Sequence, residues 1–191
     1  DPSIYSQILK IVNTVQYRGD GEPRIINLKD AMQRLGLEKV KRIALNTSVI
    51  TLFTGIQFPF GFSAESLWVH SVGVAVTSSS LADFLNFPMG DQAYSCGLIH
   101  DIGHGPFSHL WDHYIISKGE KEHEERGCDI FKNMIKKYKF DINDEEFETI
   151  CEIINPSKEN VNKWYYQIIA NKQCQLDVDK IDYIQRDSFY I

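Results

Sequence analysis

The sequence contains no apolar run of about 18 residues, the length that a membrane-spanning helix needs. It also has no charged-then-apolar leader with small residues after it, so no secretory signal is predicted. We therefore expect no membrane partner. The chain begins with Asp1 in place of methionine, so we expect a trimmed chain or a fragment of a longer protein.

Cysteines are few and far apart. The four of them form no C-x-x-C pair and stand at Cys96, Cys128, Cys151 and Cys174. Such spacing argues against a disulfide framework and against a cysteine-based zinc site. Reduced thiols and a cytoplasmic location are the expectation.

A basic stripe is missing as well. The net charge is −6 at pH 7, so general nucleic-acid binding is not expected. The charge is also uneven: residues 1–60 hold 8 basic and 5 acidic residues, whereas residues 61–191 hold 12 and 21. Either the acidic part holds cations or the two parts have different origins.

Alternation of apolar and polar residues at a period of two is absent over any useful length. Helical spacing predicts helices over residues 1–15, 27–36, 37–53, 64–87, 91–100, 106–116, 123–138, 144–154, 160–170 and 177–187. A length of 191 residues fits one domain. We therefore predict a single all-α domain over residues 1–191.

The stretch HDIGHGPFSH at residues 100–109 is the part of the chain hardest to explain by packing. His100 and Asp101 end an apolar helix, so both are expected to be buried. A buried carboxylate beside a buried imidazole needs a compensating charge, which a divalent metal supplies. The doublet alone leaves a second reading open, a hydrogen-bonded His-Asp pair at a helix end.

Two further residues favour the metal. His70 lies among apolar residues of a long helix, and Asp179 belongs to a last helix that is rich in aspartate. Together with His100 and Asp101 they form a set of two nitrogen and two oxygen ligands. One divalent ion is expected, and Fe, Mn, Zn, Ni and Mg all suit such ligands in varying degree. A metal of this kind activates water and polarises phosphoryl oxygens, so hydrolysis is the natural reaction.

This pattern, H, then HD, then D on separate helices, resembles the HD-domain metal-dependent phosphohydrolases. The segments HDIGHGPFSHLWD (100–112), HE (123–124) and DVDKIDYIQRD (177–187) resemble one branch in particular, the deoxynucleoside triphosphate triphosphohydrolases that join a sterile alpha motif to an HD domain. The resemblance implies a helical bundle around a metal site, with His70, His100, Asp101 and Asp179 as ligands.

The same resemblance implies further roles. Catalytic or phosphate-facing positions would be His104, His109, Asp112 and His123, and substrate contacts would be Lys180, Tyr183 and Asp187. The residues themselves agree in part, since His109 and Asp112 form an i, i+3 pair on one helix. Without the resemblance, His123 would pass for a surface residue in a charged run.

Upstream residues follow another pattern. The segments ILKIVNTVQY (8–17), INLKDAMQRLGLEKVKRIAL (26–45) and LWVHSVGVAVTSSSLADFL (67–85) resemble the HDOD signalling domains, which are usually non-catalytic. We therefore divide the chain into an HDOD-like part, residues 1–100, and a triphosphohydrolase-like part, residues 100–191. This division predicts a chimera joined in the shared HD core, or a natural hybrid.

Two functions follow from these resemblances. The first is a phosphohydrolase framework acting on a nucleotide or another small phosphoester, with deoxynucleoside triphosphate cleaved to deoxynucleoside and triphosphate. Leu67 stands where those enzymes carry arginine, so metal binding should survive better than substrate specificity. The second is a non-catalytic signalling or interaction domain with a structural metal. The sequence leaves the oligomeric state open, and an oligomer is one outcome.

Overall fold

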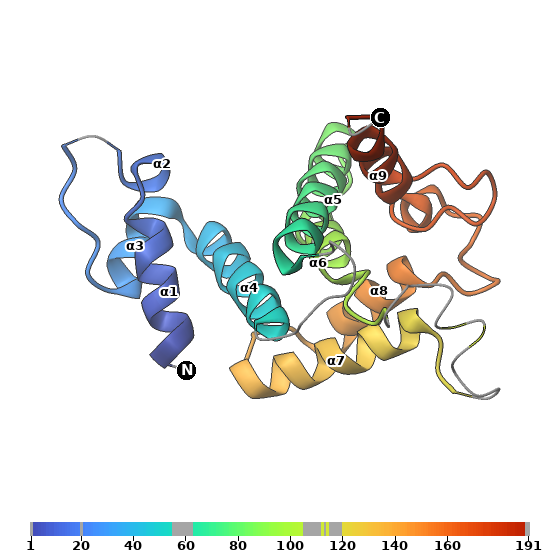
Figure 1. Ribbon diagram of the computed structural model, residues 1–191, viewed down its shortest axis with the longest axis horizontal. Coiled ribbons are helices and arrows are strands. Elements are labelled where there is room, and N and C mark those ends of the chain that lie inside the picture. Colours follow the sequence, from blue (N-terminus) through green and yellow to red (C-terminus); the bar gives the residue numbers. More distant parts are fainter. Residues whose placement is uncertain are drawn as a thin grey trace. The chain divides into compact units, whose positions relative to one another are not determined.

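A computed structural model describes residues 2–19, 21–54, 63–104, 112, 114 and 120–189. The described residues form helices, turns and irregular loops, and none of them is in a strand, which confirms the predicted all-α fold (Figure 1). The chain forms two compact units, residues 1–54 and 55–191. That all 191 residues act as one HD-type domain stays a prediction.

The first unit consists of α1 (Pro2–Val12), α2 (Val15–Arg18), α3 (Leu28–Leu35) and α4 (Leu37–Phe53). Helices α1 and α3 both pack on α4, and Val12, Ile25 and Ala31 are fully buried. The side chain of Asn13 ties the loop to α1, because its amide nitrogen donates to the Ile25 carbonyl while its oxygen accepts from the Ile25 N–H.

Both ends of α3 follow from local chemistry. Asn27 caps its start, since the side-chain oxygen accepts a hydrogen bond from the Asp30 N–H at 2.9 Å. Gly36 ends it with φ of 85°, a left-handed conformation that glycine adopts without steric cost. The sequence predicted both of these boundaries.

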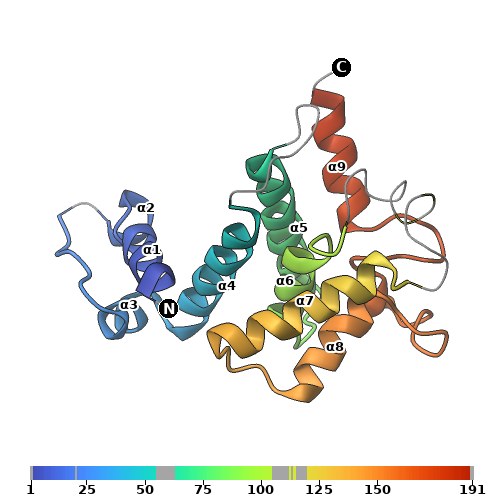
Figure 2. The ribbon, with the colours of Figure 1, turned by 60° about the horizontal axis from the view of Figure 1, so that its bottom comes forward.

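The second unit consists of α5 (Ala64–Phe84), α6 (Gly90–Ile99), α7 (His123–Tyr138), α8 (Asp144–Ile154), the 3-10 turn η2 (Trp164–Gln167) and α9 (Val178–Phe189). Helix α6 packs against α5 on one side and α8 on another, and α9 lies against α5 (Figure 2). Cys96, Leu98 and Ile99 of α6 are fully buried, so α6 is the centre of this unit.

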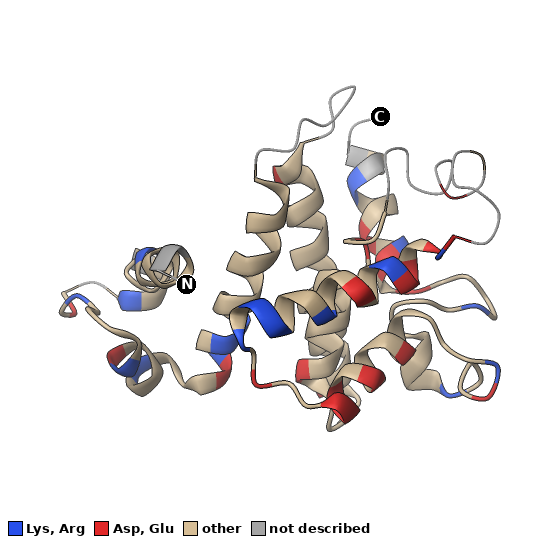
Figure 3. Ribbon diagram, turned by 90° about the horizontal axis from the view of Figure 1, so that it is seen from below, with Lys and Arg blue, Asp and Glu red and all other residues tan. Residues whose placement is uncertain are grey.

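The close approach of α5 and α6 depends on Gly97. A methyl group at Gly97 would lie 2.7 Å from both the nitrogen and the Cα of Ala75, which is closer than real contacts allow. Few charges lie on these two helices, whereas α7 and α8 carry many (Figure 3). Helix α6 ends at Ile99, so His100 and Asp101 emerge directly from the core.

One predicted helix, over residues 160–170, is wrong. Only Trp164–Gln167 forms a short 3-10 turn there. The Asn160 amide instead donates to the Glu152 carboxylate, and the Gln167 amide donates to the Val161 carbonyl, so side chains compete with helical bonding. The rings of Trp164 and Tyr165 contact Phe87 instead. The predicted helix over 106–116 falls largely outside the described residues.

Candidate metal centre

Four side chains from three parts of the second unit meet at one point. His70 comes from the second turn of α5, His100 and Asp101 follow α6, and Asp179 lies in the first turn of α9. One donor atom from each of the four lies within 4.8 Å of the others. The structure thus brings together all four predicted ligands, His70, His100, Asp101 and Asp179.

The atoms that face one another are imidazole Nε2 and carboxylate oxygens. His70 Nε2 lies 3.3 Å from Asp101 Oδ2 and 3.1 Å from Asp179 Oδ1. His100 Nε2 lies 3.3 Å from Asp101 Oδ1 and 3.4 Å from the same oxygen of Asp179. Two nitrogens and two carboxylates therefore converge as one set of donors.

The other nitrogen of each imidazole is already held. His100 Nδ1 lies 2.8 Å from the Gly97 carbonyl, and His70 Nδ1 lies 2.7 Å from Asp182 Oδ2. A carbonyl or an ionised carboxylate can only accept, so each Nδ1 carries the proton. Each Nε2 then offers a lone pair in the neutral ring, the arrangement usual for histidines that bind metals.

The electrostatics of the cluster are those of carboxylates balanced by imidazoles. Burial lowers the pKa of His70, but the carboxylates of Asp101, Asp179 and Asp182 outweigh it and raise that pKa to about 10. The pKa of His100 is also raised against the effect of burial, by Asp101 and Asp179. Burial raises the pKa of Asp179, whereas His100 and His70 lower it to about 2. The carboxylates therefore strongly favour a positive charge at the centre of the cluster.

These residues fit a divalent metal. His100 Nε2 is a buried atom that makes no hydrogen bond within the described residues, although it points at two carboxylates. A buried polar atom without a hydrogen bond is costly unless another partner satisfies it. Two imidazoles and two carboxylates suit first-row divalent ions. A cation between them would satisfy that nitrogen and neutralise the two acids.

A second cluster lies next to the first. His104 Nε2 is 3.2 Å from Asp101 Oδ1, and the His104 ring stacks on that of His123 at 4.0 Å with an angle of 16° between planes. His123 Nδ1 donates to Asp112 Oδ2 at 2.7 Å. Donor atoms of these three residues also lie within 4.8 Å of one another. Two nearly parallel rings direct their lone pairs into separate planes, however, so one ion cannot lie in both. Proton transfer suits this cluster better than chelation.

Arg126 stabilises that second cluster and was missed by sequence reasoning. Its guanidinium donates to Asp112 Oδ1, and its Nε donates to the Gly103 carbonyl at 3.0 Å. Against the effect of burial, Arg126 and His123 hold the pKa of Asp112 below its usual value. Burial and the neighbouring His104 lower the pKa of His123. His123 is therefore mainly neutral at pH 7, held by an ionised Asp112.

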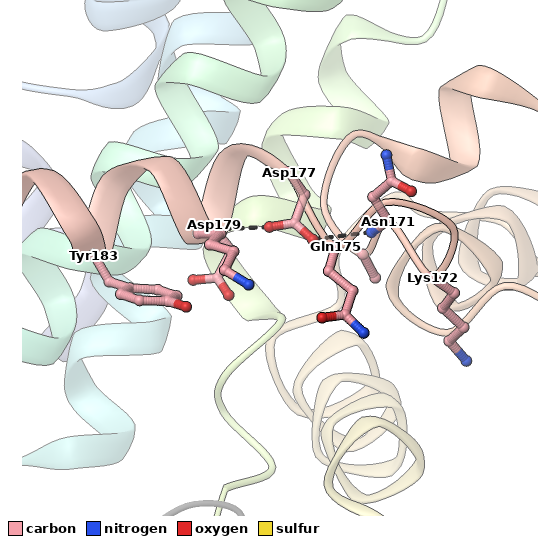
Figure 4. Close-up of a pocket in the computed structure, with 8 residues that line it drawn as sticks. Asn171, Lys172, Gln175, Asp177, Asp179 and Tyr183 are labelled. Carbon is pink, nitrogen blue, oxygen red and sulfur yellow. Dashed lines mark hydrogen bonds between the residues drawn. The ribbon is translucent and has the colours of Figure 1, made fainter.

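An open pocket of about 410 Å³ begins at Asp179 and follows the loop before α9. In Figure 4 the side chains of Lys172, Gln175, Asp179 and Tyr183 extend to the same side of the ribbon. The pocket is lined by Ala170, Asn171, Lys172, Gln175, Asp177, Asp179, Lys180 and Tyr183. It thus includes Lys180 and Tyr183, two of the three predicted substrate residues.

The loop that lines this pocket is ordered by its own polar groups. Asp177 accepts from the backbone N–H of Asn171 and of Lys180, both at 2.9 Å. The Asn171 side-chain oxygen accepts from the N–H of Gln173 and of Cys174. Sequence reasoning missed Asn171, Lys172 and Gln175, because polar loop residues carry no periodic signal.

Two of the predicted residues are not placed. His109 and the side chain of Asp187 lie outside the described residues, so the structure gives no position for either. The sequence shows Asp182 and Arg186 as an i, i+4 pair on α9, and the structure confirms that they contact each other. The contact of Asp182 with His70 could not be predicted from this spacing.

Comparison with known proteins gives two kinds of match. The family model for the HDOD domain matches residues 1–141. The HD domain-containing protein L394 of Acanthamoeba polyphaga mimivirus is 43% identical over 96 residues, which is 48% of this chain and 21% of that protein. Human deoxynucleoside triphosphate triphosphohydrolase SAMHD1 is 25% identical over 224 aligned positions, covering 98% of this chain and 34% of the enzyme. A SAMHD1 homologue of Dictyostelium discoideum is 28% identical over 149 residues, which covers 71% of this chain and 29% of that protein.

Among solved structures, an HDOD domain protein from Geobacter sulfurreducens matches with a TM-score of 0.54 and 18% identity. The match covers 100% of this chain and 79% of that one, and it shows the fold alone. The chain spans between about a fifth and about a third of the length of the curated relatives named above.

The two resemblances overlap along the chain. The HDOD match runs past residue 100, and the match to human SAMHD1 covers nearly the whole chain. A chimera joined near residue 100 stays a prediction. Since the HDOD model matches well over half of the residues, the chain belongs to the HDOD domain family, within the HD superfamily of helical metal-binding domains.

Proposed function

We propose that this chain binds one divalent metal through His70, His100, Asp101 and Asp179, and that the centre hydrolyses a phosphoester, with a nucleotide as the substrate class. One observation carries the proposal: four donor atoms from three parts of the fold converge within 4.8 Å, next to a pocket that starts at one of them. Fe, Mn, Zn, Ni and Mg all remain candidates.

The chemistry of the bound ion and that of the chain are complementary. A divalent metal supplies Lewis acidity and a nucleophile at neutral pH. Beside it, Asp112 fixes the orientation of the His123 ring through Nδ1 and leaves Nε2 to exchange a proton. In the protein without substrate His123 is mainly neutral. The negative charge of a phosphate nearby would raise its pKa and favour the protonated form that can donate to a leaving oxygen.

The lining of the pocket favours an anionic ligand. Lys172 and Lys180 both line it, and Asp177 already accepts two backbone hydrogen bonds. The two ammonium groups offset phosphate charge, while the Tyr183 ring offers a surface for a flat group. Several relatives are named deoxynucleoside triphosphate triphosphohydrolases, which makes deoxynucleoside triphosphates the first substrates to test.

The experiment is an activity assay with matched variants. Purified protein is loaded with Mn²⁺ or Fe²⁺. Release of triphosphate and phosphate is followed with each deoxynucleoside triphosphate, and release of p-nitrophenol is followed with bis(p-nitrophenyl) phosphate. We expect turnover in the parent protein and none in Asp179→Ala. Asp129→Asn is the control, because Asp129 is an exposed acid that pairs with Lys121 away from the centre. Turnover that survives in Asp179→Ala would refute the proposal.

A second candidate is favoured by the HDOD match over residues 1–141. In that function the chain is a non-catalytic signalling or interaction domain, and the metal only stabilises the fold. The same protein distinguishes the two, since the second candidate predicts metal-dependent melting with no hydrolysis of any substrate. An oligomer stays open under both candidates.

We also propose a cytoplasmic location. Its four cysteines are all free in the structure, which suits a reducing compartment. Among the helices of the described residues, none is long and apolar enough to span a membrane.

A further inference from the structure

Behind His70, on the side away from the other ligands, two residues of α9 form a connected pair. The carboxylate of Asp182 accepts from His70 Nδ1 at 2.7 Å. Arg186 holds the same carboxylate through both of its oxygens: Nε donates to Oδ2, and Nη2 donates to Oδ1 at 3.1 Å. Such a two-point contact fixes the plane of the carboxylate as well as its distance.

The pair is also fixed to α5. Arg186 Nη2 donates to the backbone carbonyl of Val69 at 3.1 Å, one residue before His70. Gly73 leaves the space that this contact needs, because a methyl group there would lie 2.6 Å from Asp182 Oδ1 and 2.7 Å from Arg186 Nη2. Helix α9 is therefore attached to α5 at both the ring and the backbone of the His70 turn.

We propose that Asp182 and Arg186 are positioning residues of the metal centre, holding the His70 ring at the orientation in which Nε2 meets the ion. Asp182 also keeps the proton on Nδ1, which leaves the lone pair of Nε2 available to the metal and raises the basicity of that nitrogen. This role rests on the metal site proposed above. In this role, the i, i+4 pair Asp182–Arg186 supports the metal centre, and stabilising the surface of α9 is not its main function.

The arrangement has a mechanical consequence. Asp179, a ligand, and Asp182, the holder of another ligand, stand one turn apart on α9. Helix α9 would therefore help to hold a metal directly through Asp179 and indirectly through Asp182, which contacts His70 of α5. Metal binding should then slow amide hydrogen exchange along residues 178–189 more than along α8.

The test uses Co²⁺ alone as the probe, because its visible absorption reports ligand geometry as well as binding. We expect Asp182→Asn to weaken Co²⁺ binding about 10- to 100-fold and to change the spectrum. Arg186→Lys keeps the positive charge, but lysine cannot contact both oxygens of the Asp182 carboxylate. The Co²⁺ affinity of this variant should therefore lie between those of the parent protein and Asp182→Asn. Asp129→Asn is the matched control, and circular dichroism of each metal-free variant checks the fold.

Gly73→Ala tests the same role without removing a polar group. Its methyl must push Asp182 and Arg186 away from α5. In the matched Gly90→Ala change the methyl lies 2.8 Å from the exposed carboxylate of Asp83 and at an ordinary contact distance, 3.8 Å, from the Ser79 hydroxyl. We expect weaker Co²⁺ binding and faster exchange along α9 in Gly73→Ala, and neither effect in Gly90→Ala.

The outcomes separate the two proposals. If the parent protein binds no Co²⁺, the proposed metal site itself fails. If the parent binds Co²⁺ and Asp179→Ala does not, the site stands. Equal affinity and identical spectra for Asp182→Asn, Arg186→Lys and the parent would then overturn the positioning role alone.

Discussion

Replacing Gly97 with alanine tests how the fold builds the centre. The added methyl would lie 2.7 Å from the nitrogen and the Cα of Ala75 and 2.8 Å from the carbonyl carbon of Val74. All three atoms belong to the backbone of α5, so no change of side-chain rotamer can relieve the contact. Carbon atoms pack at about 3.5–4.0 Å, so α5 and α6 must separate by about 1 Å.

The size of the effect follows from this displacement. Overpacking of a tight core costs about 1–3 kcal/mol, and a backbone-to-backbone contact belongs at the upper end. Alanine recovers about 1 kcal/mol of helix propensity over glycine. We therefore expect a net loss of about 2 kcal/mol in the free energy of unfolding. His70 would move away from His100 by more than the roughly 0.5 Å that a preorganised site tolerates, so metal affinity should fall as well.

Urea unfolding measures the first effect and titration with Co²⁺ the second. Gly90→Ala is the control on the same helix, since its methyl meets the movable side chain of Asp83. Gly97→Ala should unfold at lower urea concentration with an unchanged m value. Equal stability and equal metal affinity in the two alanine variants would refute the account of the α5–α6 contact.

Three further predictions concern other parts of the second unit. Arg126→Ala should lower the free energy of unfolding in urea by about 1–2 kcal/mol, because Asp112 and the Gly103 carbonyl lose a charged donor; no loss would mean that solvent replaces it. Asn143→Ala removes the capping box at the start of α8 and should lower the free energy of unfolding by about 1 kcal/mol in the same assay. Asn162→Ala, in the loop after α8, is the control, and an equal loss of stability in both variants would contradict the prediction. Metal affinity, measured by calorimetry, should rise from pH 6 to pH 9 with release of protons. The pKa of His70 is raised to about 10, so protonated His70 stabilises the metal-free protein fully below pH 6.5, and this stabilisation is lost as the pH approaches 10. The same proton competes with the metal for His70, so its loss favours metal binding. A metal affinity that does not change with pH would contradict this.

The sequence predicted the parts of the fold that local chemistry determines. Asn27 and Gly36 delimit α3 where expected, because a capping side chain and a left-handed glycine act within a few residues. The helix predicted over 160–170 failed, because the Glu152 carboxylate and the Phe87 ring compete for that segment from a distance. A periodic pattern contains no information on such partners.

The candidate site divides in the same way. His70, His100, Asp101 and Asp179 were predicted from their order along the chain, and the structure brings their donor atoms together. Their role as metal ligands stays a prediction. The contact between His70 and Asp182 joins residues 112 positions apart, so spacing along one helix could not reveal it.

The central claim is that these four side chains hold a divalent metal, and metal content tests it most directly. Protein exposed to Mn²⁺ or Fe²⁺, then freed of excess ion, is measured by elemental analysis beside His100→Ala and Asp179→Ala. The account predicts one ion per chain in the parent protein and little or none in either variant. A parent protein without metal, or variants that retain as much as the parent, would contradict it.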